Sequence, residues 1–259
     1  MRHFYIDPLA VTKRLAYIEG DEAHHIKNVL RLKPGDHLKL IDGTGVEYTA
    51  EINKIEAGKV EVAVRNTQQP ETGPKIRTMV AQAFLKDKKM DDLVRSLSEL
   101  GIDGWIPFFS QRSIARPDKK PLAGRIQRWK RIAAAALKQC RRKSMLEISD
   151  TLSWEEVLEL GQSFDLKIVF WEHETKPLNR NIWNAAGATL GSVMVMLGPE
   201  GGFTDQEIET ARQAGFVTAG LGPRILRAET ATLAASTLVQ YIFGDMGPNP
   251  AKPEMKIED

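Results

Sequence analysis

Hydrophobic and polar residues alternate along the first part of the chain in the manner of short β-strands. Strands are expected at 37–42, 46–55 and 59–65, the last with valines at every second position. A period of two places those valines on one face of a sheet. A helix is expected over 21–32, with Asp21 as its N-cap and Val29 on its inner face. Short strands with tight turns predict a small β-barrel domain over 1–69.

From residue 76 onward, apolar runs alternate with stretches of helical periodicity. Strands are expected at 76–84, 104–109, 166–172, 192–197 and 216–221, with helices between them. This order predicts an α/β domain with a mainly parallel sheet over 76–244. The stretch 70–75 is polar and rich in proline and glycine, so a linker is expected there. The segment 245–259 has few apolar residues to bury and is expected to be a disordered tail.

Composition says little about the function of the protein, but it bears on its charge and on the compartment where it is found. The chain has 36 basic and 34 acidic residues and a formal net charge of +2, so local clusters of charge matter more than the total. A single cysteine, Cys140, excludes an internal disulfide and favours a reducing compartment. No apolar run approaches the roughly 20 residues that cross a membrane, and the start of the chain does not resemble a signal peptide. A cytoplasmic protein is therefore expected.

A Leu-Gly-Pro turn occurs twice, at 197–199 and at 221–223, each time after an apolar run. In open α/β sheets, ligands bind beyond the carboxyl ends of strands, where such turns lie. Glu200 would repel phosphate groups, and no phosphate-binding glycine motif is present, so a ligand with positive charge fits better. No metal site is expected from the His and Cys spacing. The alternative is that the first turn only links a strand to a helix capped by Thr204.

The paired segments 197–209 and 221–231 resemble the SPOUT class of RNA methyltransferases, and within it the bacterial 16S ribosomal RNA uracil-N3-methyltransferase family. Segments 24–36, 88–102 and 129–142 extend this resemblance over nearly the whole chain. One departure is that Met145 and Leu146 stand near a point where relatives usually have a proline. The resemblance implies a trefoil-knotted SPOUT methyltransferase domain preceded by a small PUA-like RNA-binding β-barrel domain.

The function that this resemblance implies is transfer of a methyl group from S-adenosylmethionine to N3 of a uridine in 16S ribosomal RNA. The implied partners are 16S ribosomal RNA or the small ribosomal subunit, and a second copy of the chain. Two alternatives stay open: ribose 2′-O-methylation by the same fold, and a non-catalytic RNA-binding or ribosome-assembly factor. The implied cofactor-binding residues are Trp171, Glu172, Leu197, Gly198, Pro199, Glu200, Gly201, Gly202, Leu221, Gly222, Ile225, Leu226, Arg227 and Ala228. A larger side chain at Gly201 is expected to fill the cofactor pocket.

The catalytic candidates are charged residues around this pocket. Arg227 is the first choice for stabilising developing negative charge on the uracil, with Arg2 and Arg224 as second choices. Glu200 or Glu229 could accept the proton of N3, although Glu229 could instead serve the start of the last helix.

Basic residues suggest an RNA-binding surface. The candidates are Lys27, Arg31, Lys33, Arg112, Arg141 and Arg142. Phosphate contacts dominate RNA affinity, but a basic helix face is also often simply solvated. The last helix has an apolar arc that includes Leu238 and Tyr241 and is wider than one sheet face needs. The resemblance implies a homodimer, and this apolar arc supports the expectation that the two copies pair through this helix.

Overall fold

The chain folds into two compact units. The computed structural model describes residues 3–12, 14–69, 76–86, 88–113, 119–140, 142–178, 182 and 190–247. One unit comprises Met1–Gly73 with Ala133–Met145, and the other Pro74–Ile132 with Leu146–Asp259. The predicted linker 70–75 and most of the predicted tail lie outside the described residues, so the domain limits stay predictions. The segment 133–145, expected in the second domain, packs with the first unit.

A five-stranded sheet forms the first unit. Its strands are β1 (His3–Tyr5), β2 (Leu15–Glu19), β3 (His37–Ile41), β4 (Glu47–Ile55) and β5 (Lys59–Gln68), in the order β1-β3-β4-β5-β2. All neighbours are antiparallel except β1 and β3. The last three strands agree with the alternation in the sequence, which buries Val60 and Val62 completely. The short strands β1 and β2 were not expected.

The helical segment of the first unit differs from its prediction. It consists of α1 (Gly20–His24) followed by a π-helical turn, η2 (His25–Val29), and it ends before residue 32. Glu19 occupies the N-cap position, which was expected for Asp21. The wider π turn changes the angular position of each side chain. Ile26 is therefore buried, whereas Val29, expected on the inner face, is 63% exposed.

A six-stranded sheet lies at the centre of the second unit. Its strands are β6 (Arg77–Ala83), β7 (Gly104–Phe108), β8 (Glu147–Ile148), β9 (Leu166–Phe170), β10 (Ser192–Leu197) and β11 (Val217–Ala219), in the order β11-β9-β10-β6-β7-β8. Every neighbouring pair is parallel. This confirms the predicted α/β class with a parallel sheet. The two-residue strand β8 was not expected.

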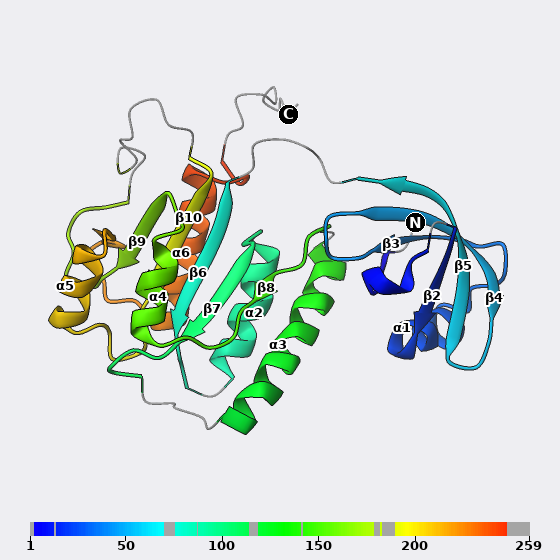
Figure 1. The fold of residues 1–259 in the computed structure, drawn as a ribbon, viewed down its shortest axis with the longest axis horizontal. Coiled ribbons are helices and arrows are strands. Elements are labelled where there is room, and N and C mark those ends of the chain that lie inside the picture. The colour runs from blue at the N-terminus through cyan, green and yellow to red at the C-terminus, as the bar shows by residue number, and fades with distance from the viewer. Residues whose placement is uncertain are drawn as a thin grey trace. The chain divides into compact units, whose positions relative to one another are not determined.

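Helices cover both faces of this sheet (Figure 1). They are α2 (Lys89–Glu99), α3 (Lys119–Cys140), α4 (Trp154–Gly161), α5 (Asp205–Gln213) and α6 (Ala228–Ile242). α4 and α5 share an apolar core with one face of the strands. α2 and α6 pack together on the other face. The ring of Trp129 in α3 also packs there against the ring of Trp105 in β7, with 4.8 Å between the ring centroids. None of the helices in the described residues is long and apolar enough to cross a membrane.

The strand order places three loops at one edge of the sheet. β11, β9 and β10 are neighbours and parallel, so the segments after them leave the sheet at the same edge. This arrangement is where open α/β sheets bind their ligands. The predicted capping box at the start of α5 is present, with Thr204 and Glu207 exchanging hydrogen bonds. The trefoil knot that the resemblance implies stays a prediction.

Candidate active site

The three loops enclose a pocket of about 590 Å³. They are the segments 171–173 after β9, 197–202 from the last residue of β10 onward, and 221–228 from the loop after β11 to the first residue of α6. All fourteen residues predicted to bind the cofactor line this one pocket, together with Lys89, Phe170, His173, Arg224 and Ala231. The structure therefore brings the predicted set together, and the contact of each residue with a cofactor stays a prediction.

Two glycines adopt left-handed backbone conformations in the loops of the pocket, and one of them lies close to a neighbouring loop. Gly202 has a φ of +67°, and its amide donates a hydrogen bond to Pro199 O at 3.0 Å, which closes a tight turn. A Cβ atom at Gly202 would lie 2.0 Å from Oε1 of Glu172. Gly222, in the loop before α6, has a φ of +91°. Residues with a side chain adopt such φ values at a cost, so glycine suits both turns.

Gly201 lines the pocket, and its backbone also lies against Arg112. A Cβ atom at Gly201 would meet the Cβ of Arg112 at 3.3 Å, so a larger side chain would press on Arg112, and the expected filling of the cofactor pocket stays a prediction. Arg112 is itself held against this turn, because its Nη1 donates hydrogen bonds to Gly201 O at 3.0 Å and to Phe203 O at 3.3 Å. Its predicted contact with RNA would have to be made from this position.

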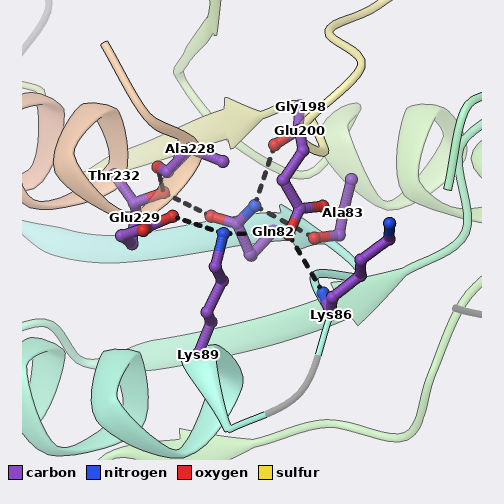
Figure 2. A network of polar contacts seen from close by, with 9 residues as sticks. All are labelled: Gln82, Ala83, Lys86, Lys89, Gly198, Glu200, Ala228, Glu229 and Thr232. Atoms are coloured by element: carbon purple, nitrogen blue, oxygen red, sulfur yellow. Dashed lines mark hydrogen bonds and ion pairs between the residues drawn. The ribbon is translucent and has the colours of Figure 1, made fainter. Parts of the chain in front are cut away.

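A lysine that the sequence prediction missed joins two of the predicted carboxylates (Figure 2). Nζ of Lys89 lies 3.1 Å from Oε1 of Glu200 and 3.2 Å from Oε2 of Glu229. Oε1 of Glu200 also accepts a hydrogen bond from the amide of Lys86 at 3.1 Å. The sequence offered one signal for this role. Lys89 follows the loop between a predicted strand and a predicted helix, and such loops lie at the edge of the sheet where Glu200 was also expected.

This network affects the choice of a proton acceptor. Burial raises the pKa of Glu200, but hydrogen bonds from backbone amides and from Lys89 outweigh it, so the pKa is lowered overall. The hydrogen bond to Glu200 raises the pKa of Lys89, against the effect of burial. Glu200 is thus held as an ionised partner of Lys89, which weakens it as a base. Glu229 lies in the first turn of α6, where an acidic residue favours the helix.

A buried glutamine positions the first turn of the pocket. Gln82 of β6 is inaccessible to solvent, and its Nε2 donates hydrogen bonds to Ala83 O and to Gly198 O, both at 3.0 Å. The hydroxyl of Thr232 lies within hydrogen-bond distance of Gln82 Oε1 and of Ala228 O (Figure 2). Gln82 therefore connects the Gly198 turn to the start of α6. Its signal was a lone amide inside an apolar strand.

The arginines proposed for catalysis have different positions. Arg227 is the N-cap residue of α6, lines the pocket and is exposed. Arg224 also lines the pocket and is exposed. Arg2 lies outside the described residues. Among the three candidates, the structure therefore places Arg227 and Arg224 at the pocket.

The basic residues predicted to bind RNA fall into separate groups. Lys27, Arg31 and Lys33 are exposed on the first unit, and Arg31 has a φ of +52°. Arg142 is half-buried, and Arg141 lies outside the described residues. Two basic residues of α3 form ion pairs: Arg128 with Asp91 at 2.5 Å, and Lys138 with Glu22. These two pairs favour a structural role for that part of α3.

The residues present at the pocket fit S-adenosylmethionine. The volume is within the range of small-molecule sites, about 300–1,000 Å³. The lining combines backbone groups of two glycine-rich turns, leucines such as Leu197 and Leu226, and the carboxylates of Glu172 and Glu200. Carboxylates suit hydroxyl groups and a cationic sulfonium better than they suit phosphate. Among the described residues, no group of three or more His, Cys, Asp or Glu side chains could hold a metal ion.

Comparison with protein families identifies matches to both parts of the chain. The family model described as RNA methyltransferase domain matches residues 72–240, and the one described as RNA methyltransferase PUA domain matches residues 18–65. The first of these covers more than half of the chain. The two matches follow the same order along the chain as the two sheets.

Named relatives and solved structures agree with these matches. Ribosomal RNA small subunit methyltransferase E of Bacillus subtilis is 33% identical over 86% of this chain and 89% of the relative. The protein of the same name from Buchnera aphidicola of Schizaphis graminum is 32% identical over 93% and 96%. The Neisseria gonorrhoeae structure of that methyltransferase, bound to S-adenosyl methionine, has a TM-score of 0.81 and 28% identity over 95% and 99%. A putative Legionella pneumophila methyltransferase in complex with the same cofactor has a TM-score of 0.79 and 26% identity over 92% and 96%.

Proposed function

Because this chain belongs to the RNA methyltransferase family that includes ribosomal RNA small subunit methyltransferase E, we propose that it methylates N3 of a uridine in 16S ribosomal RNA. S-adenosylmethionine is the proposed methyl donor. The observation that carries the proposal is the pocket at the carboxyl ends of β9, β10 and β11, which collects all the residues expected to bind this cofactor. The PUA match over residues 18–65 supports an RNA substrate.

The chemistry needs the uracil outside a base pair and free of its N3 proton. N3 lies on the Watson–Crick edge, so the base must be unpaired or flipped out before it reaches the pocket. S-adenosylmethionine, when bound, supplies an electrophilic methyl group on its sulfonium. Arg227, exposed at the pocket, would stabilise the negative charge that develops on the uracil oxygens as the proton leaves. Glu200 and Glu229 both lie within 3.2 Å of Lys89, and Glu229 does not line the pocket, so Glu172 is the better proposal for the proton acceptor.

Nucleoside analysis tests the reaction. Purified protein is incubated with S-adenosylmethionine and small-subunit ribosomal RNA, free or assembled, and the RNA is digested and analysed by mass spectrometry. The proposal predicts 3-methyluridine. Appearance of 2′-O-methyluridine would support the ribose-methylating alternative. Cofactor binding without any methylated nucleoside, on free RNA and on subunits, would support the non-catalytic alternative.

A substitution on α6 tests the pocket directly. Ala231 lines the pocket from the first turns of α6, and leucine is a good helix former. Ala231→Leu is therefore expected to keep the fold and to occupy space that the cofactor needs. Affinity for S-adenosylmethionine should fall at least about tenfold, or 1.4 kcal/mol. Calorimetric titration measures this, with Ala214→Leu, which lies outside the pocket, as the size-matched control. Unchanged affinity in a folded Ala231→Leu protein would remove the cofactor from this pocket.

We further propose that the protein is a homodimer that uses the outer face of α6. The inner face is buried through residues such as Ala235 and Val239. On the outer face, Leu238 is 38% exposed and Tyr241 is 56% exposed. Burying this apolar face against a second copy fits the commonest oligomer symmetry. Sedimentation at micromolar concentration should give twice the chain mass of 29.0 kDa, and a monomer would refute the dimer.

The partner and compartment follow from the proposed substrate. The small ribosomal subunit, or its RNA before assembly, is the proposed partner. The named relatives are bacterial proteins, and bacteria make ribosomes in the cytoplasm, so the cytoplasm is the proposed location.

A further inference from the structure

Lys89, Glu200 and Glu229 form a network of three charged side chains beside the pocket. Its three residues come from three separate segments: the start of α2, the turn after β10 and the first turn of α6 (Figure 2). One ammonium group lies within 3.2 Å of two carboxylates. The charges of +1, −1 and −1 sum to −1 when all three groups are ionised. The network therefore has an unbalanced negative charge.

The lowered pKa of Glu200 and the raised pKa of Lys89 keep this ion pair charged at neutral pH. The side chains of Lys89, Glu200 and Glu229 are only 33%, 26% and 29% exposed, so water screens them less than fully exposed groups. As a stabilising contact alone, such a partly exposed pair contributes little.

The unbalanced charge is positioned to act on a ligand in the pocket. Lys89 and Glu200 line the pocket, and Glu229 follows Ala228, which also lines it. The other charged lining residues are Glu172, Arg224 and Arg227, and all three are exposed. Their charges of −1, +1 and +1 sum to +1, which by itself disfavours a cation. The net charge of the network offsets this excess.

We propose that the network formed by Lys89, Glu200 and Glu229 raises the affinity of the pocket for a positively charged sulfonium relative to a neutral thioether, because it offsets the positive charge of the other lining residues. The inference rests on the proposed use of S-adenosylmethionine. Methyl transfer converts that cation into neutral S-adenosylhomocysteine, while the rest of the molecule keeps its shape. The network would then stabilise the cofactor before transfer but not the product after it, and so favour product release. Glu229 would act through charge alone, because it does not line the pocket.

Replacing Glu229 with glutamine separates charge from contact. Glu229→Gln removes one negative charge and keeps nearly the same side-chain shape. Two unit charges on the order of 8 Å apart, at an effective dielectric constant of about 40, interact strongly enough to change an affinity by roughly sixfold. We therefore expect S-adenosylmethionine to bind about three- to tenfold more weakly to this variant. S-adenosylhomocysteine should bind within about twofold of its affinity for the unchanged protein.

Calorimetric titration with three ligands provides the test. Sinefungin is the third ligand, because it carries a positively charged amine near the position of the sulfonium and transfers no methyl group. In Glu229→Gln, the affinity for sinefungin should fall together with the affinity for S-adenosylmethionine. In Lys89→Arg, which keeps the charge, the ratio of the affinities for S-adenosylmethionine and S-adenosylhomocysteine should stay unchanged. Glu159→Gln, on the exposed surface of α4, serves as the matched control.

Two results would overturn the inference. Equal weakening of all three ligands in Glu229→Gln would show that the network only holds the loops in place. Equal affinities in the variant and the unchanged protein would show that the ligand does not sense this charge. If the unchanged protein binds none of the three ligands, the proposed cofactor fails as well. If it binds them and methylates RNA but the ratio does not respond to Glu229→Gln, only this inference fails.

Discussion

Arg227→Ala is expected to lower the rate of methyl transfer by about 10²–10³-fold, with a small change in cofactor affinity. A donor aimed at charge that develops in the transition state typically contributes this much. Arg227 is suited to that role because it is the N-cap residue of α6, lines the pocket and is exposed. Single-turnover methylation at saturating cofactor measures the transfer step.

Two other variants, measured in the same way, serve as controls for Arg227→Ala. Arg227→Lys keeps a positive charge and should recover part of the rate. Arg95→Ala removes an exposed arginine of α2 that is not part of the pocket and should have no effect. A near-normal single-turnover rate in Arg227→Ala would remove Arg227 from the mechanism, and Arg224 would become the candidate.

The second large effect concerns RNA affinity. Lys27, Arg31 and Lys33 are exposed on the first unit, close together in sequence around the end of η2. Replacing all three is expected to reduce the slope of log affinity against log salt by about 2, since each lost phosphate contact removes about 0.7–0.9. With a slope change of 2, the ratio of the affinity of the unchanged protein to that of the variant is about 100-fold larger at 0.1 M salt than at 1 M salt. Binding of 16S ribosomal RNA across a salt series measures both quantities.

The choice of substitution depends on the backbone conformation at each position. Arg31 has a φ of +52°, a conformation that asparagine tolerates better than alanine, so the triple variant is Lys27→Ala, Arg31→Asn and Lys33→Ala. Lys54→Ala is a control in the same unit, because Lys54 is already paired with Glu56 at 2.5 Å. An unchanged slope in the triple variant would mean that these residues are only solvated and that RNA binds elsewhere.

Periodicity predicted most of the fold because long elements average over many residues. The five strands expected in the second unit are all present, and the parallel sheet follows from their alternation with helices. β1, β2 and β8 were missed because they are short, and their pairing depends on partners far along the chain. The π-helical turn at 25–29 was missed because backbone hydrogen bonding, not side-chain spacing, defines it.

The site was predictable where chemistry depends on consecutive residues. The two Leu-Gly-Pro turns and their neighbours were found from their motifs, and they line one pocket. Lys89 and Gln82 were missed because their roles arise from contacts with residues more than 100 positions away. A Cβ atom at Gly201 would point toward Arg112, and this direction depends on backbone angles that a motif does not reveal.

Mass spectrometry of 16S ribosomal RNA from cells that lack this protein tests the central claim most directly. The account predicts that one 3-methyluridine disappears, that the unchanged protein restores it and that Arg227→Ala does not. A full content of 3-methyluridine in 16S ribosomal RNA from the deletion strain would contradict the account.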